Sequence, residues 1–112
     1  MEKEVSCKQV IVSDPFYESF GQIYDFGCET FGYFQAERYG QKIRQSLDTL
    51  PDFYLAYPEC RYLATKSRMY RNIILDAHRI IYRITNKRIE VLDIIHSASS
   101  ISKIRSTRKI RL

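Results

Sequence analysis

The sequence predicts an α+β fold, with an N-terminal strand, a helical hairpin and then a three- to four-stranded antiparallel sheet. In the first half, apolar residues recur every three or four positions, as they do on one face of a helix. In the second half, β-branched and aromatic residues form three dense runs that short polar connectors separate. The length of 112 residues suits one domain, so we expect a single domain over 1–112 with a basic C-terminal segment at about 97–112.

The helical hairpin is predicted from two apolar stripes and the residues that bound them. Residues 8–12 alternate weakly and predict a short strand, after which Asp14 is expected to cap a helix with Pro15 at its first position. Gly32 is expected to end this helix, and Pro51 is expected to end the second one. The two stripes are Phe16, Phe20, Ile23, Tyr24, Gly27 and Phe31, then Phe34, Ala36, Tyr39, Ile43, Leu47 and Leu50.

The sheet is predicted from the runs Tyr70–Leu75, Arg79–Thr85 and Ile89–Ile95, which form a meander with tight hairpins. The preceding segment, 52–68, is irregular, and its sequence allows a short strand near 61–63. After the last run, serines break the pattern, and isoleucines then suggest a loosely amphipathic final helix or strand.

A two-residue turn at Asn86-Lys87 fixes the expected register of the last two strands. It places Arg83 opposite Glu90, Ile81 opposite Leu92 and Arg79 opposite Ile94. One face, to be covered by the helices, then carries Ile80, Tyr82, Ile84, Ile89, Val91, Asp93 and Ile95. The other carries Arg79, Ile81, Arg83, Glu90, Leu92, Ile94 and His96. This second face is a binding surface or is covered by the basic C-terminal segment; the two alternatives do not exclude each other, and both stay open.

Charge and composition narrow the class of protein. The net charge is +5, from 18 Lys and Arg against 13 Asp and Glu, and the residues from Lys87 onward are strongly basic. Such a segment attracts a polyanion or an acidic partner, or is simply solvated. No apolar run approaches the roughly 20 residues that span a bilayer, so we expect a cytoplasmic chain without membrane contact. The cysteines Cys7, Cys28 and Cys60 match no disulfide or zinc pattern, and we expect no metal or cofactor.

Four segments in fixed order resemble the ParE/RelE superfamily of toxins from bacterial type II toxin–antitoxin systems. They are Leu47–Pro51, Tyr70-Arg71, His78–Ile84 and Ile89–His96, and the resemblance extends from about residue 10 to 103. The ParE branch is closer than the RelE branch, because the chain carries Tyr-Arg, Tyr-Arg-Ile and a strand that closes in Ile-Ile-His.

The resemblance implies a toxin that forms a hetero-oligomer with a cognate antitoxin, whose flexible tail binds along helix and sheet surfaces. Operator DNA would be contacted only through the antitoxin. ParE-like members imply inhibition of DNA gyrase, which we favour, whereas RelE-like members imply ribosome-dependent mRNA cleavage. Asp93 stands where many ParE-like chains have arginine, and Ser97–Ser100 replace a Gly-x-Arg-Asp-like segment. A third alternative is therefore an inactive relative that retains only antitoxin binding.

Candidate site residues follow from these alternatives. RNA cleavage requires proton carriers and cations for the developing charge, for which the candidates are His96, Arg83 and Arg79. The structural alternatives are a strand-end histidine bonded to backbone and an ion pair of Arg83 with Glu90. The candidate partner-binding residues are Arg61, Lys66, Arg68, Arg71, Ile81, Leu92, Ile94, Lys103 and Arg105.

Overall fold

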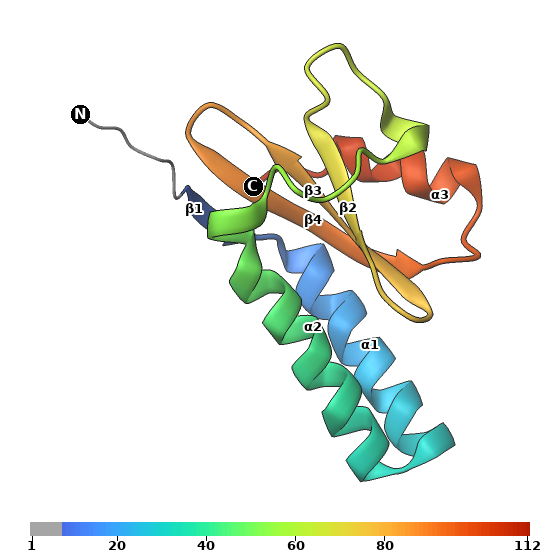
Figure 1. Ribbon diagram of the computed structural model, residues 1–112. Helices are drawn as coiled ribbons and strands as arrows, with labels where there is room; N and C mark the ends of the chain where they lie inside the picture. Colours follow the sequence, from blue (N-terminus) through green and yellow to red (C-terminus); the bar gives the residue numbers. More distant parts are fainter. Residues whose placement is uncertain (1–7) are drawn as a thin grey trace.

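A four-stranded sheet with a helical hairpin on one face and a short C-terminal helix on the other makes up the fold (Figure 1). The computed structural model describes residues 8–112, so the expectation for Cys7 lies outside the described residues. The elements in chain order are β1 (Gln9–Val12), α1 (Asp14–Phe31), α2 (Tyr33–Phe53), the 3₁₀ helix η1 (Arg61–Leu63), β2 (Tyr70–Ile74), β3 (His78–Ile84), β4 (Arg88–His96), α3 (Ile101–Ser106) and the 3₁₀ helix η2 (Thr107–Lys109).

The strand order is β1-β4-β3-β2. Strands β2, β3 and β4 form the expected antiparallel meander, whereas β1 pairs with β4 in parallel. The α+β prediction is confirmed, and the parallel edge strand is the one departure from an antiparallel sheet.

Helix α1 is capped one residue earlier than the sequence suggested. The hydroxyl of Ser13, not the carboxylate of Asp14, accepts a hydrogen bond from the Phe16 amide at 3.1 Å. The same hydroxyl donates to the carbonyl of Leu92 at 2.6 Å. Ser13 is almost fully buried, so its side chain joins the start of the hairpin to β4.

Replacing Ser13 with alanine is expected to lower the free energy of unfolding by about 1–2 kcal/mol, because a buried N-cap and its second bond are both lost. Urea denaturation measures this change. Ser100→Ala, which removes the exposed N-cap of the short helix α3, is the matched control and should cost less. Equal losses in the two variants would contradict the joining role of Ser13.

The turn between the helices is tight. Gly32 ends α1 as predicted and adopts φ of +93°, a conformation that side-chain-bearing residues rarely take. Near this turn the helices approach closely, since a Cβ built on Gly27 would lie 3.4 Å from the Cβ of Ala36. Helix α2 does not end at Pro51 as expected but continues to Phe53, because proline removes one donor while its own φ suits a helix.

The segment between the hairpin and the sheet follows the β2 edge. The strand that the sequence allowed near 61–63 is the 3₁₀ helix η1 instead. The Arg71 guanidinium holds this segment by donating to the carbonyls of Leu55 at 2.9 Å, Tyr57 at 3.0 Å and Arg68 at 3.1 Å.

A bulge in β4 changes the predicted register. Arg83 lies opposite Glu90 as expected, but Ile81 lies opposite Asp93 rather than Leu92, and Arg79 opposite Ile95 rather than Ile94. The extra residue in β4 reverses which face every later side chain takes. It occurs where β1 gives way to α1, and the Ser13 hydroxyl binds the Leu92 carbonyl at this point.

Each face of the sheet carries its own core. The hairpin buries the cluster Phe16, Ile43, Leu50, Tyr54, Ile73, Ile80, Tyr82, Ile89, Val91 and Ile94. The C-terminal segment covers the other face and buries the cluster Cys60, Leu63, Tyr70, Ile81, Leu92, Ile95 and Ile104. Of the two alternatives for the second face, the structure therefore has the covered one. Within residues 8–112, no helix is long and apolar enough to cross a membrane.

Candidate partner-binding groove

A groove lies between the inner side of the helical hairpin and the ends of β3 and β4. The hairpin extends beyond the sheet (Figure 1), so the far turns of α1 and α2 have no strand beneath them. The resulting cavity has a volume of about 690 Å³. Its apolar lining includes Phe20, Ile23, Phe26, Phe31, Ala36 and Ile43.

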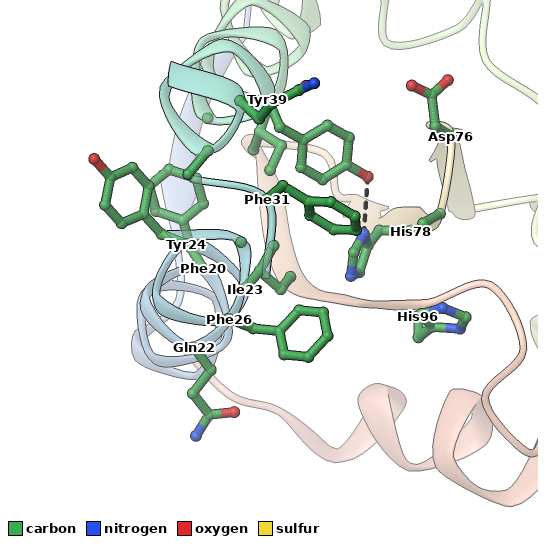
Figure 2. Close-up of a pocket in the computed structure, with 16 residues that line it drawn as sticks. Phe20, Gln22, Ile23, Tyr24, Phe26, Phe31, Tyr39, Asp76, His78 and His96 are labelled. Carbon is green, nitrogen blue, oxygen red and sulfur yellow. Dashed lines mark hydrogen bonds between the residues drawn. The ribbon is translucent and has the colours of Figure 1, made fainter. Parts of the chain in front are cut away.

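Two aromatic residues of this lining are largely exposed. Phe26 is 62% and Phe31 66% accessible, and Figure 2 shows both rings directed from the hairpin toward the side where His78 and His96 lie. Large apolar side chains exposed next to a cavity indicate a surface that a partner covers.

A polar cluster lies at the sheet side of the groove. The Tyr39 hydroxyl and His78 Nδ1 are joined by a hydrogen bond of 2.8 Å (Figure 2). His78 pairs with His96 across β3 and β4, and their ring centroids are 5.4 Å apart. The Ala98 amide donates to His96 Nδ1 at 3.0 Å, and Lys42 pairs with Asp76 at the groove rim.

Burial favours the neutral forms of two members of this cluster, His78 and Tyr39. Burial lowers the pKa of His78, and the neighbouring His96 lowers it further. Burial likewise raises the pKa of Tyr39. A groove whose inner polar groups are neutral suits an apolar partner surface with few charges.

We expect the His78 ring to titrate below its ordinary value of about 6.5 in an NMR titration. The His96→Gln variant should move the midpoint back upward, because it removes a neighbouring positive charge at acid pH. As pH falls, His78 is protonated in the unfolded chain at a higher pH than in the folded chain. This difference lowers the free energy of unfolding as pH falls below about 6.5. A midpoint at or above 6.5 in the unmodified protein would contradict the buried, neutral cluster.

The candidate catalytic residues lie on opposite sides of the sheet. His96 was expected to share a face with Arg79 and Arg83, and this is wrong, because the bulge turns His96 toward the hairpin. Its bond to the Ala98 amide matches the strand-end alternative.

Both arginines face the C-terminal segment. Arg83 Nη2 lies 2.6 Å from Glu90 Oε1, which confirms the cross-strand ion pair. Arg79 Nη1 donates to Asn72 Oδ1 at 3.1 Å, while its buried Nε has no hydrogen-bond partner within residues 8–112.

The candidate partner-binding residues divide by exposure. Ile81, Leu92 and Ile94 are buried in the two cores and offer no accessible surface in this structure. Arg71 is occupied in holding the segment before β2. The remaining candidates are exposed: Arg61, Lys66, Arg68, Lys103 and Arg105.

The sequence interpretation did not single out Phe26 and Phe31 as surface residues. Phe31 belongs to an apolar stripe that predicts a helix face, and such a stripe does not reveal where the sheet beneath it ends. Phe26 lies outside the predicted stripes. Among the described residues 8–112, no group of three or more His, Cys, Asp and Glu side chains could hold a metal ion.

Comparisons with known proteins agree with this fold. The family model described as the ParE toxin of type II toxin–antitoxin systems, parDE, matches residues 10–101. A chain in the solved structure of the chromosomal ParDE toxin–antitoxin system from P. aeruginosa is similar, with a TM-score of 0.67 and 16% identity. The match covers 80% of this chain and 96% of that chain, and at this identity it shows the fold alone. No curated protein matches in sequence.

Proposed function

The chain belongs to the ParE toxin family of type II toxin–antitoxin systems, and we propose that it arrests growth by binding and inhibiting DNA gyrase. Membership in this family implies a cognate antitoxin as partner. In this proposal the antitoxin neutralises the toxin by occupying the groove between the hairpin and the sheet.

One observation favours inhibition by binding over RNA cleavage. Cleavage requires a proton carrier and cations at the same phosphate. The sheet separates His96 from Arg79 and Arg83, and Arg83 is already bound to Glu90 and to two carbonyls of the C-terminal segment. This separation of His96 from the two arginines supports inhibition by binding.

The apolar lining of the groove supports an amphipathic helix as its occupant. Such a helix presents anchors at positions i, i+3, i+4 and i+7 to a hydrophobic groove, and it is about 10–12 Å wide with its side chains. Phe26 and Phe31 offer aromatic surface for those anchors, and Tyr39 and His78 offer polar atoms at the sheet side. A flexible antitoxin tail that folds on binding would gain this buried surface.

Controlled expression in bacteria, with and without the antitoxin, tests the proposal. Gyrase inhibition predicts filamentation and chromosomal double-strand breaks with intact transcripts, and the antitoxin should reverse both effects. Intact DNA with truncated transcripts would instead identify an mRNA endonuclease. No growth arrest at matched protein levels would identify an inactive relative.

A double variant further distinguishes gyrase inhibition from mRNA cleavage. His96→Ala with Arg79→Gln removes two of the three candidate catalytic groups. It should retain growth arrest if inhibition occurs by binding, and lose it if these side chains act on RNA.

A further inference from the structure

In the C-terminal helical segment, buried side chains recur every three residues, and so do the arginines. The side chains of Ile104 and Thr107 are buried against the sheet and that of Ile110 is partly buried, whereas those of Arg105, Arg108 and Arg111 are exposed. Residues i and i+3 come nearly into line along a helix that is partly 3₁₀, as in the succession of α3 and η2. Arg105 and Arg108 therefore lie nearly in line on the outer side of this helix. Arg111 is also exposed and lies two residues beyond the end of η2, after an extended Ile110. We call these three residues the arginine row.

The segment that carries this arginine row is rich in basic residues. Lys103 and Lys109 are also exposed, and residues 97–112 contain no acidic residue. The nearest preceding acids are engaged elsewhere, since Glu90 binds Arg83 and Arg88, and Asp93 accepts a hydrogen bond from Ser19. Among the ion pairs of residues 8–112, none involves the five basic residues of this segment.

The segment is held firmly on the sheet. Arg83 donates to the carbonyls of Arg108 at 3.3 Å and Ile110 at 3.0 Å, and the buried Thr107 hydroxyl donates to the Ile104 carbonyl at 2.7 Å. These bonds fix the backbone that carries the arginine row. A charged row on a fixed backbone loses less conformational freedom on binding than a frayed tail would.

We propose that this arginine row binds the phosphate backbone of duplex DNA. Arg105 and Arg111 are six positions apart. With a rise of about 1.5–2.0 Å per residue as far as Lys109 and about 3.3 Å over the two extended positions that follow, the row spans roughly 13–15 Å. One DNA strand presents about four phosphates over such a length. Arginine guanidinium groups recognise phosphate oxygens well, and binding through them requires no base contact.

The chemistry of the segment favours duplex DNA over other polyanions. Residues 97–112 contain no aromatic side chain on which the bases of a single strand would stack. Protein interfaces usually place apolar or aromatic anchors at their centre. Between Ile101 and Leu112, the exposed positions are all basic or hydroxyl-bearing, and the exposed apolar residues Ile101 and Leu112 lie only at the two ends of the segment. The apolar side chains at Ile104 and Ile110 face the sheet instead.

This inference goes beyond gyrase inhibition and does not depend on it. The arginine row lies on the opposite face of the sheet from the hairpin groove, as the two separate cores show. The toxin in this proposal contacts DNA directly while the antitoxin groove stays accessible.

Fluorescence anisotropy of the purified full-length chain with a labelled 20-bp duplex of arbitrary sequence tests the proposal between 50 and 200 mM salt. The triple variant Arg105→Gln, Arg108→Gln, Arg111→Gln should raise Kd at least about tenfold at 50 mM salt. It should also reduce the slope of log K against log salt by about 2.7, since each phosphate contact contributes about 0.9. Replacing the same three arginines with lysine should preserve binding.

The matched control removes three basic residues of α2, through Arg38→Gln, Lys42→Gln and Arg44→Gln, and should leave the slope unchanged. Equal losses in both triple variants would overturn the proposal, because net charge alone would then account for binding. No binding at 50 mM salt, or equally tight binding of a single strand or of polyglutamate, would overturn it too. If the glutamine triple does not fold, Arg111→Gln alone should reduce the slope by about 0.9.

Discussion

Replacing Phe26 and Phe31 with alanine is expected to weaken antitoxin binding by about 100- to 1000-fold without a matching loss of stability. Both rings are largely exposed in the free chain, so the folded protein gains little from them. In the complex they would be covered within the groove, where truncating an aromatic anchor typically costs about 2 kcal/mol or more. Isothermal titration calorimetry with the purified antitoxin measures the change in Kd, and urea denaturation measures stability.

Phe53→Ala is the matched control for this prediction. Phe53 is also an exposed phenylalanine of the hairpin, but it does not line the groove. Its replacement should leave antitoxin affinity unchanged. An unchanged affinity in the Phe26 and Phe31 variant, or an equal loss in Phe53→Ala, would place the antitoxin elsewhere.

Replacing Arg83 with methionine is expected to lower the free energy of unfolding by about 3–5 kcal/mol. The side chains of Arg83 and Glu90 are only 13% and 9% exposed, and removing one member of a buried ion pair leaves the other charge poorly compensated. The variant also loses the bonds to the carbonyls of Arg108 and Ile110. Urea denaturation gives the stability change, and hydrogen exchange should show lost protection in 101–112.

Arg88→Met provides the comparison. Arg88 binds the same carboxylate at 2.8 Å, but its side chain is 33% exposed and contacts less of the C-terminal segment. The loss should therefore be smaller than for Arg83. Adding Glu90→Leu to Arg83→Met should recover part of the stability, because no unpaired charge stays buried. Equal losses for the two arginine variants would contradict the role given to Arg83.

The ion pair of Arg83 with Glu90 makes the stability of the fold depend on pH. Burial acts to raise the pKa of Glu90, but the hydrogen bonds and charges of Arg83 and Arg88 outweigh it and hold the pKa below its ordinary value. A carboxylate of this kind contributes stability above its unfolded pKa of about 4.3, and the contribution is lost as pH falls through the folded value. Between pH 5 and 3, the wild-type chain should lose more stability than Arg83→Met, and an equal loss would contradict this assignment.

Local pattern predicted the elements, and a long-range contact decided the register. The apolar stripes and dense β-branched runs gave both helices and the three meander strands, because these patterns depend on neighbours in sequence. The bulge at Leu92 accompanies a bond from Ser13, 79 positions earlier, and no local pattern contains it. Missing the bulge placed His96 on the wrong face. The same contact explains why the prediction of Asp14 as the helix cap was wrong, since Ser13 caps the helix and also reaches the Leu92 carbonyl.

The groove was harder to predict than the fold. Phe31 has the spacing of a core residue and Phe26 lies outside the predicted stripes, and the exposure of both depends on how far the hairpin extends beyond the sheet. In contrast, the three-residue repeat of Ile104, Thr107 and Ile110 is visible in the sequence. Only the structure shows that this repeat marks the side of the segment that packs on the second sheet face.

The supercoiling activity of purified DNA gyrase on relaxed plasmid tests the central claim most directly. We predict that stoichiometric amounts of the chain inhibit supercoiling and leave cleaved plasmid, and that added antitoxin restores activity. The Phe26 and Phe31 variant should inhibit gyrase yet resist the antitoxin, provided that gyrase does not bind the same groove. Full gyrase activity in the presence of excess chain, together with mRNA cleavage in a ribosomal translation reaction, would contradict the account.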